Sequence, residues 1–142
     1  MKAIRLFFTI ALVIPFLSCN AQPEKKEVKT SDNASDKIEA YYFHFTARCV
    51  TCRTIEAKAR ENLEVLYPNH VKQGLITFQS VNLEEASSRP LAERLGVSGQ
   101  TLLLVKGDQK INLTNEGFMY AVAKPDKFKE IINEKVEGLL IK

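Results

Sequence analysis

The sequence lacks several features that would assign a function at once. It has no internal repeats and no glycine-rich phosphate or flavin motif, so nothing in it predicts a bound nucleotide or organic cofactor. It also has little excess charge, with 20 basic and 17 acidic residues and a formal net charge of +3. Lys2 and Arg5 lie in a segment expected to be removed, which leaves 18 basic residues against 17 acidic ones, or +1. A balance this even gives no reason to expect a nucleic-acid partner.

Long hydrophobic runs are also scarce. The one apolar run, Leu6–Leu17, is too short to span a bilayer comfortably, and it follows the basic stretch "MKAIR", which is typical of an export signal. The sequence "FLSC" resembles a bacterial lipobox and predicts a signal peptide at residues 1–18 with a lipid on Cys19. The alternative is a plain signal peptide cut after Ala21. Asn20 favours a lipid anchor in the outer membrane, facing the periplasm.

Cysteine is rare, and its use is informative. Of three cysteines, the lipid would occupy Cys19, which leaves Cys49 and Cys52 in an exported protein whose compartment allows a disulfide.

Residues 19–37 are polar and have no apolar period, which predicts a flexible tether. Residues 38–142 then form one domain, because the chain is 45% hydrophobic and 26% charged, as expected for a globular protein.

The domain alternates between strand-like and helix-like patterns. Aromatic and apolar runs predict strands, and apolar stripes of helical period predict helices. We expect a strand at 38–45, a helix at 52–67, a strand at 74–83, a helix at 87–97, a hairpin at 101–114 with its turn at 106–109, and a helix at 124–140. This β-α-β-α-β-β-α order predicts an α/β fold with a mixed four-stranded sheet and helices on both faces. The second strand is nearly continuous in apolar residues, which predicts cover on both of its faces.

The two remaining cysteines lie where the first strand gives way to the first helix. A helix N-terminus favours an anion, and Arg48 and Arg53 add positive charge, so we expect the pKa of Cys49 to be lowered. Cys52 follows one turn later, within reach for a disulfide and turned towards the core. A Cys-x-x-Cys pair near a β-α-β unit is a redox signature.

The element order and this motif together resemble the thioredoxin-like family over Ile38 to Leu140, including "PLAERLGVSGQTLLLVKGDQ" as second helix, loop and central hairpin. More narrowly, the chain resembles small exported proteins of the ArsF family, named as a nitrophenyl compound nitroreductase subunit. The resemblance implies a thiol–disulfide oxidoreductase in which Cys49 attacks a disulfide of a partner protein and Cys52 resolves the mixed disulfide.

The chain departs from the family pattern at three places. Val50 and Thr51 stand between the cysteines, where thioredoxins have Gly-Pro. The buried acid of the family's first strand maps onto Phe43, which carries no proton. Gln100 takes the place of the family's cis-proline, and we expect its peptide bond to be trans because a cis bond there is costly. The resemblance makes Gln100 and Thr101 the substrate-docking edge.

Two further side chains are candidates for the dithiol site. Glu56 lies one helical turn after Cys52, and we hypothesise that it accepts or returns the Cys52 proton. The alternative is a solvated glutamate on a surface helix. His44 could tune the thiolate of Cys49, and the alternative is a hydrogen-bonded packing residue.

Three functions remain open at this point. The first is a membrane-tethered oxidoreductase that needs neither cofactor nor metal. The second is a protein that binds a soft metal or metalloid through Cys49, Cys52 and His44, although structural zinc requires four ligands. The third is a non-catalytic subunit of a partner complex. We favour the first, because the element order, the export signal and the cysteine positions agree.

Overall fold

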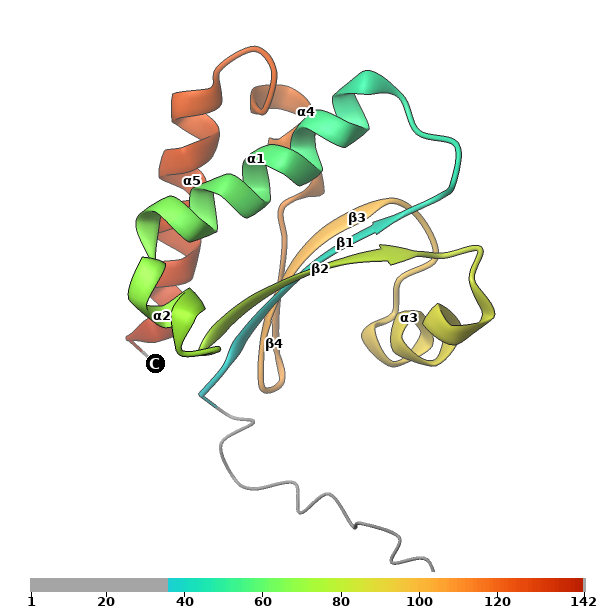
Figure 1. Ribbon diagram of the computed structural model, residues 1–142, viewed down its shortest axis with the longest axis horizontal. Coiled ribbons are helices and arrows are strands. Elements are labelled where there is room, and N and C mark those ends of the chain that lie inside the picture. Colours follow the sequence, from blue (N-terminus) through green and yellow to red (C-terminus); the bar gives the residue numbers. More distant parts are fainter. Residues whose placement is uncertain (1–35, 142) are drawn as a thin grey trace, which may run out of the picture.

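The computed structural model of the protein describes residues 36–141 (Figure 1). Its elements are β1 (Ile38–His44), α1 (Val50–Leu66), α2 (Pro68–Lys72), β2 (Ile76–Asn82), a short 3-10 helix (Ala86–Ser88), α3 (Arg89–Leu95), β3 (Thr101–Lys106), β4 (Gln109–Asn112), α4 (Thr114–Tyr120) and α5 (Pro125–Leu140). Each predicted element is present, and α2 and α4 are additions. The predicted signal peptide, Cys19 and all but the last two residues of the predicted tether lie outside the described residues. None of the helices described is long and apolar enough to cross a membrane.

The four strands form one mixed sheet with the order β2-β1-β3-β4. β1 and β2 are parallel, with Tyr42 opposite Ser80, as the crossover through α1 requires. β3 runs antiparallel to β1, and β4 runs antiparallel to β3 across the two-residue turn of Gly107 and Asp108. This topology confirms the predicted fold class, an α/β fold with a mixed four-stranded sheet.

Strand β1 is central and carries the core on both of its faces. Alternate side chains of a strand point to opposite faces, so Ile38, Ala40 and Tyr42 pack with α1 and α5, whereas Tyr41 and Phe43 pack with α3. Figure 1 shows α1 and α5 on one side of the sheet and α3 on the other. Helices therefore cover both faces, as predicted.

The predicted cover on both faces of the second strand is only partial: Ile76 packs in one core and Val81 in the other, but the centre of the strand is exposed. β2 lies at an edge of the sheet, and only Ile76 and Val81 of its residues are buried. Gln79 and Ser80 are exposed at its centre. The apolar run predicted burial from composition, but strand order is decided by the pairing of β3 with β1, which leaves β2 with one neighbour.

Helix α4 was not predicted because its seven residues are too few to show a helical period and, unlike the equally short α3, it has neither a proline in its first turn nor a glycine at its C-cap. It packs across α1 through Gly117, which is buried. A Cβ atom at Gly117 would lie 2.9 Å from Cγ2 of Ile55, closer than side chains pack. The absence of a side chain at Gly117 therefore allows α4 to approach the helix that carries the cysteines.

We predict opposite effects for the same substitution at two helical glycines. Gly117→Ala should lower the free energy of unfolding by about 1–3 kcal/mol, because the added methyl group forces Ile55 aside. Gly138→Ala in α5 should raise it by about 0.5–1 kcal/mol, because nothing lies within 4 Å and alanine favours the helix. Urea unfolding of both variants measures this, and equal effects at the two sites would contradict the close approach of α4.

Candidate dithiol active site

The two cysteines lie at the corner between β1 and α1, as predicted. Cys49 is the N-cap residue of α1, with an extended backbone (φ −73°, ψ 169°), and its sulfur accepts a hydrogen bond from the backbone N–H of Cys52 at 3.4 Å. Cys49 is exposed, whereas Cys52 is only 5% exposed. Both are free thiols, and their sulfur atoms are 2.8 Å apart. One thiol thus faces solvent, and the other lies directly behind it.

The surroundings of Cys49 lower its pKa, as predicted, through the helix N-terminus and the Cys52 thiol but not through the two arginines. The main cause is the hydrogen bond with the Cys52 thiol, followed by the backbone N–H of Cys52, with a smaller contribution from that of Thr51. Arg48 and Arg53 are not among these causes. Arg48 pairs with Glu56 of α1, and Arg53 donates to the Arg48 carbonyl at 3.0 Å. The thiolate of Cys49 is therefore favoured by the helix terminus and by its own partner cysteine.

The loop before Cys49 is held from two sides. The backbone N–H of Thr46 donates to the Glu84 carboxylate at 2.7 Å, and the Asn82 side chain donates to the Thr46 hydroxyl at 3.0 Å. On the other side, Arg53 of α1 donates to the backbone of Arg48. These bonds join the loop to the end of β2 and to the first turn of α1, so the position of Cys49 is fixed by two elements.

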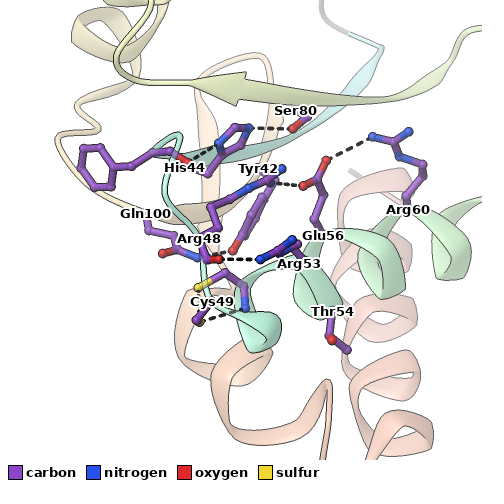
Figure 2. A network of polar contacts seen from close by, with 12 residues as sticks. Tyr42, His44, Arg48, Cys49, Arg53, Thr54, Glu56, Arg60, Ser80 and Gln100 are labelled. Atoms are coloured by element: carbon purple, nitrogen blue, oxygen red, sulfur yellow. Dashed lines mark hydrogen bonds and ion pairs between the residues drawn. The ribbon is translucent and has the colours of Figure 1, made fainter.

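Glu56 anchors the same loop through ion pairs. Its carboxylate pairs with Arg48, and more distantly with Arg60 at 3.4 Å (Figure 2). The Glu56 side chain is 15% exposed, so the solvated alternative is wrong. Burial raises the pKa of this carboxyl, but the Ser80 hydroxyl and Arg48 together outweigh it, and the net pKa is lowered. A weakly basic carboxylate is poorly suited to accept a proton from Cys52, and that role stays a prediction.

His44 is a buried, hydrogen-bonded residue. Its Nδ1 bonds to the Phe45 carbonyl at 2.9 Å, and its Nε2 bonds to the Ser80 hydroxyl at 3.0 Å. This confirms the alternative of a packing residue. Across residues 36–141, no group of three or more His, Cys, Asp or Glu side chains is placed to hold a metal ion. The three-ligand site of the two cysteines and His44 is therefore wrong.

Phe43, onto which the family's buried acid maps, does not face the helix that carries the cysteines. Phe43 packs with α3 on the opposite face, because the strand alternates. The residue of β1 that extends toward the loop of Arg48 and Cys49 is Tyr42, which is 1% exposed (Figure 2). Burial raises the pKa of Tyr42 to about 12; Gln100 opposes this, and the charge of a nearby Cys52 adds to it. The sequence alone could have indicated Tyr42, because it lies two residues before His44 and alternate residues of a strand share one face.

The predicted docking residues make internal bonds. Gln100 donates from Nε2 to the Tyr42 hydroxyl, and the Thr101 hydroxyl donates to the Gly99 carbonyl at 2.9 Å. The peptide bond of Gln100 is trans as predicted, since the described chain contains no cis peptide. Because both side chains are engaged, a docking role falls to the backbone at the start of β3, and it stays a prediction.

We predict that Cys49 is alkylated at a pH below the ordinary cysteine range of about 8.5. In Cys52→Ala the midpoint of the rate against pH should rise, because the largest cause of the lowered pKa is removed. The matched control is Val50→Ala, an exposed neighbour that leaves the Cys52 thiol in place. The rate of iodoacetamide labelling against pH measures this, and an unchanged midpoint in Cys52→Ala would contradict the described geometry.

We also predict a pH-dependent contribution of Glu56 to stability. Its pKa is lowered in the folded chain, so its contribution is present above the unfolded pKa of about 4.3 and is lost as pH falls through the folded value. Near neutral pH, Glu56→Gln should lower the free energy of unfolding by about 1–3 kcal/mol. The difference in free energy of unfolding between the two proteins should shrink in acid. A difference that does not depend on pH would argue against the ion pair. Glu61→Gln, on an exposed pair with Lys58, should change stability little.

The chain is only distantly similar to the known proteins with which it was compared. No protein-family model matches it, and no curated protein matches it. Seven chains of solved structures match. One is a malarial protein, 17% identical with a TM-score of 0.38, where the match covers 52% of this chain and 74% of that chain. Another is the germline-specific thioredoxin protein Deadhead from Drosophila melanogaster, 18% identical with a TM-score of 0.44, covering 71% and 83%. The fold class therefore rests on the sheet topology, and the ArsF resemblance stays a prediction.

Proposed function

We propose that the protein is a thiol–disulfide oxidoreductase, held at the bacterial cell envelope by a lipid on Cys19, with Cys49 as the attacking thiol and Cys52 as the resolving thiol. One observation supports this most strongly. An exposed thiol with a lowered pKa caps a helix, and a second, buried thiol lies 2.8 Å behind it. This difference in exposure separates the two roles, because a partner protein reaches only Cys49.

The reaction is an exchange of sulfur–sulfur bonds. The Cys49 thiolate attacks one sulfur of a partner disulfide, and a mixed disulfide forms. The other partner sulfur leaves as a thiolate and takes the proton that the Cys52 thiol releases. The Cys52 thiolate then attacks the Cys49 sulfur and releases the second partner thiolate. The partner disulfide gains two electrons, and the cysteine pair loses them as it closes to a disulfide. Oxidation of a partner dithiol follows the same steps in reverse.

The geometry is suited to both steps. The backbone N–H of Cys52 and the start of α1 stabilise negative charge on Cys49 during the first attack. The short distance between the sulfurs makes the second attack intramolecular, so it needs little movement of the chain. A protein that carries a disulfide or a dithiol is the expected partner, and the ArsF resemblance would place it in an enzyme complex.

A redox titration tests the proposal. The purified chain is equilibrated in glutathione or dithiothreitol buffers, and its thiols are trapped by alkylation and counted by mass. We expect a reversible transition of two thiols at a potential that glutathione or dithiothreitol buffers reach. Cys49→Ser and Cys52→Ser should each abolish it. A disulfide that resists reduction throughout, or thiols that never pair, would overturn the proposal.

A further inference from the structure

The buried side of the dithiol faces one polar side chain from the sheet. Cys52 lies on the inward stripe of α1, one turn before Ile55, and Ile55 and Tyr42 belong to the same buried cluster. Figure 2 shows the Tyr42 ring extending from β1 toward the loop that carries Arg48 and Cys49, with its hydroxyl at Gln100. Tyr42 and the inward face of the first turn of α1 thus border the same core, and the charge of Cys52 adds to the burial that raises the pKa of Tyr42.

The hydroxyl hydrogen of Tyr42 is the one hydrogen-bonding group of the phenol that still needs a partner. Gln100 donates its amide N–H to the phenol oxygen, so Tyr42 accepts that bond and keeps its own hydrogen to donate. Within residues 36–141, the bond from Gln100 is the one that the Tyr42 hydroxyl makes. A tyrosine that is 1% exposed is shielded from bulk water, and an unpaired buried donor costs free energy.

The chemistry of the second step creates an acceptor at this place. In the reduced protein, Cys52 shares a proton with Cys49, whose sulfur is 2.8 Å away. Once Cys49 is bonded to a partner, its sulfur carries no hydrogen and cannot donate to the Cys52 thiolate that forms. Because Cys52 is 5% exposed, bulk water does not replace it, and a buried anion without a donor is strongly disfavoured.

We propose that Tyr42 is a catalytic residue that donates a hydrogen bond to the Cys52 thiolate during resolution of the mixed disulfide, and that Gln100 is a positioning residue that orients the phenol. This inference rests on the proposed function. The phenol keeps its proton throughout, so Tyr42 stabilises charge and is not a base. In the reverse direction, the same hydrogen bond stabilises Cys52 as it leaves the disulfide under attack by a partner thiolate.

Other charged groups near the phenol are already engaged. Arg48 and Glu56, which also act on Tyr42, pair with each other, and His44, which stacks on the Tyr42 ring with centroids 6.2 Å apart, bonds to Ser80. Because these three groups have partners of their own, the proposed acceptor of the phenol hydrogen is the Cys52 thiolate that forms during resolution.

Two-phase kinetics with Ellman's reagent separate the two cysteines. All proteins carry Cys19→Ala, so Cys49 and Cys52 are their remaining thiols. Attack by Cys49 releases a first thionitrobenzoate, and attack by Cys52 on the mixed disulfide releases a second, which absorbance follows in a stopped-flow instrument. We expect Tyr42→Phe to leave the first rate unchanged and to slow the second about tenfold near neutral pH. The loss should shrink at high pH, where the Cys52 thiolate forms without help.

A second variant and a matched control complete the test. Gln100→Glu keeps the phenol but offers it a carboxylate acceptor, so it should slow the second phase as well, and it keeps the test decisive if Tyr42→Phe does not fold. Tyr67→Phe removes a hydroxyl that bonds to Asn133 at 2.7 Å, far along the chain from the cysteines, and should leave both phases unchanged.

The outcomes separate the inference from the proposed function. A normal second phase in both Tyr42→Phe and Gln100→Glu, or equal slowing in Tyr67→Phe, would overturn the role of Tyr42 while leaving the oxidoreductase intact. Absence of a second phase in the chain that retains Tyr42 and Gln100 would overturn the proposed function, and the role of Tyr42 with it.

Discussion

The burial of β1 on both of its faces is the constraint on which the rest depends. Its side chains contribute to two cores at once, with Tyr42 on the side of α1 and Phe43 on the side of α3. A strand held in this way cannot slip by one residue, because each side chain would change faces. The end of β1 is therefore fixed, and with it the loop that leads to Cys49 and the first turn of α1.

Cys52 is both a buried residue of the fold and a member of the dithiol. Its backbone N–H and its thiol both bond to the Cys49 sulfur, and they are the main causes of the lowered Cys49 pKa. Its side chain is also buried, and its charge contributes to the raised pKa of Tyr42. In the proposed reaction, one residue would thus stabilise the attacking thiolate, supply the second nucleophile and interact with the polar group beneath the site. Arginine charge contributes less than the sequence indicates, because Arg48 is committed to Glu56.

The sequence predicted most of the fold, because periodicity and turn residues are local signals. The strands, the helices α1, α3 and α5, the turn at Gly107 and the corner at Cys49 all follow from them. Helix α4 was missed because its seven residues show no period and it lacks the proline and glycine that mark the ends of α3. The exposure of β2 was missed because strand order is a non-local property. At the site, the cysteines were predicted from spacing alone. Tyr42 was missed because a family pattern directed attention to Phe43, one residue away on the wrong face.

The central claim is that Cys49 attacks and Cys52 resolves. Trapping with oxidised glutathione tests this most directly, with Cys19→Ala in every protein and intact mass as the measurement. The account predicts that Cys52→Ser retains one glutathione rapidly, that Cys49→Ser reacts far more slowly because Cys52 is buried, and that the chain with both cysteines releases glutathione as it closes its own disulfide. Equal or faster capture of glutathione by Cys49→Ser would contradict it.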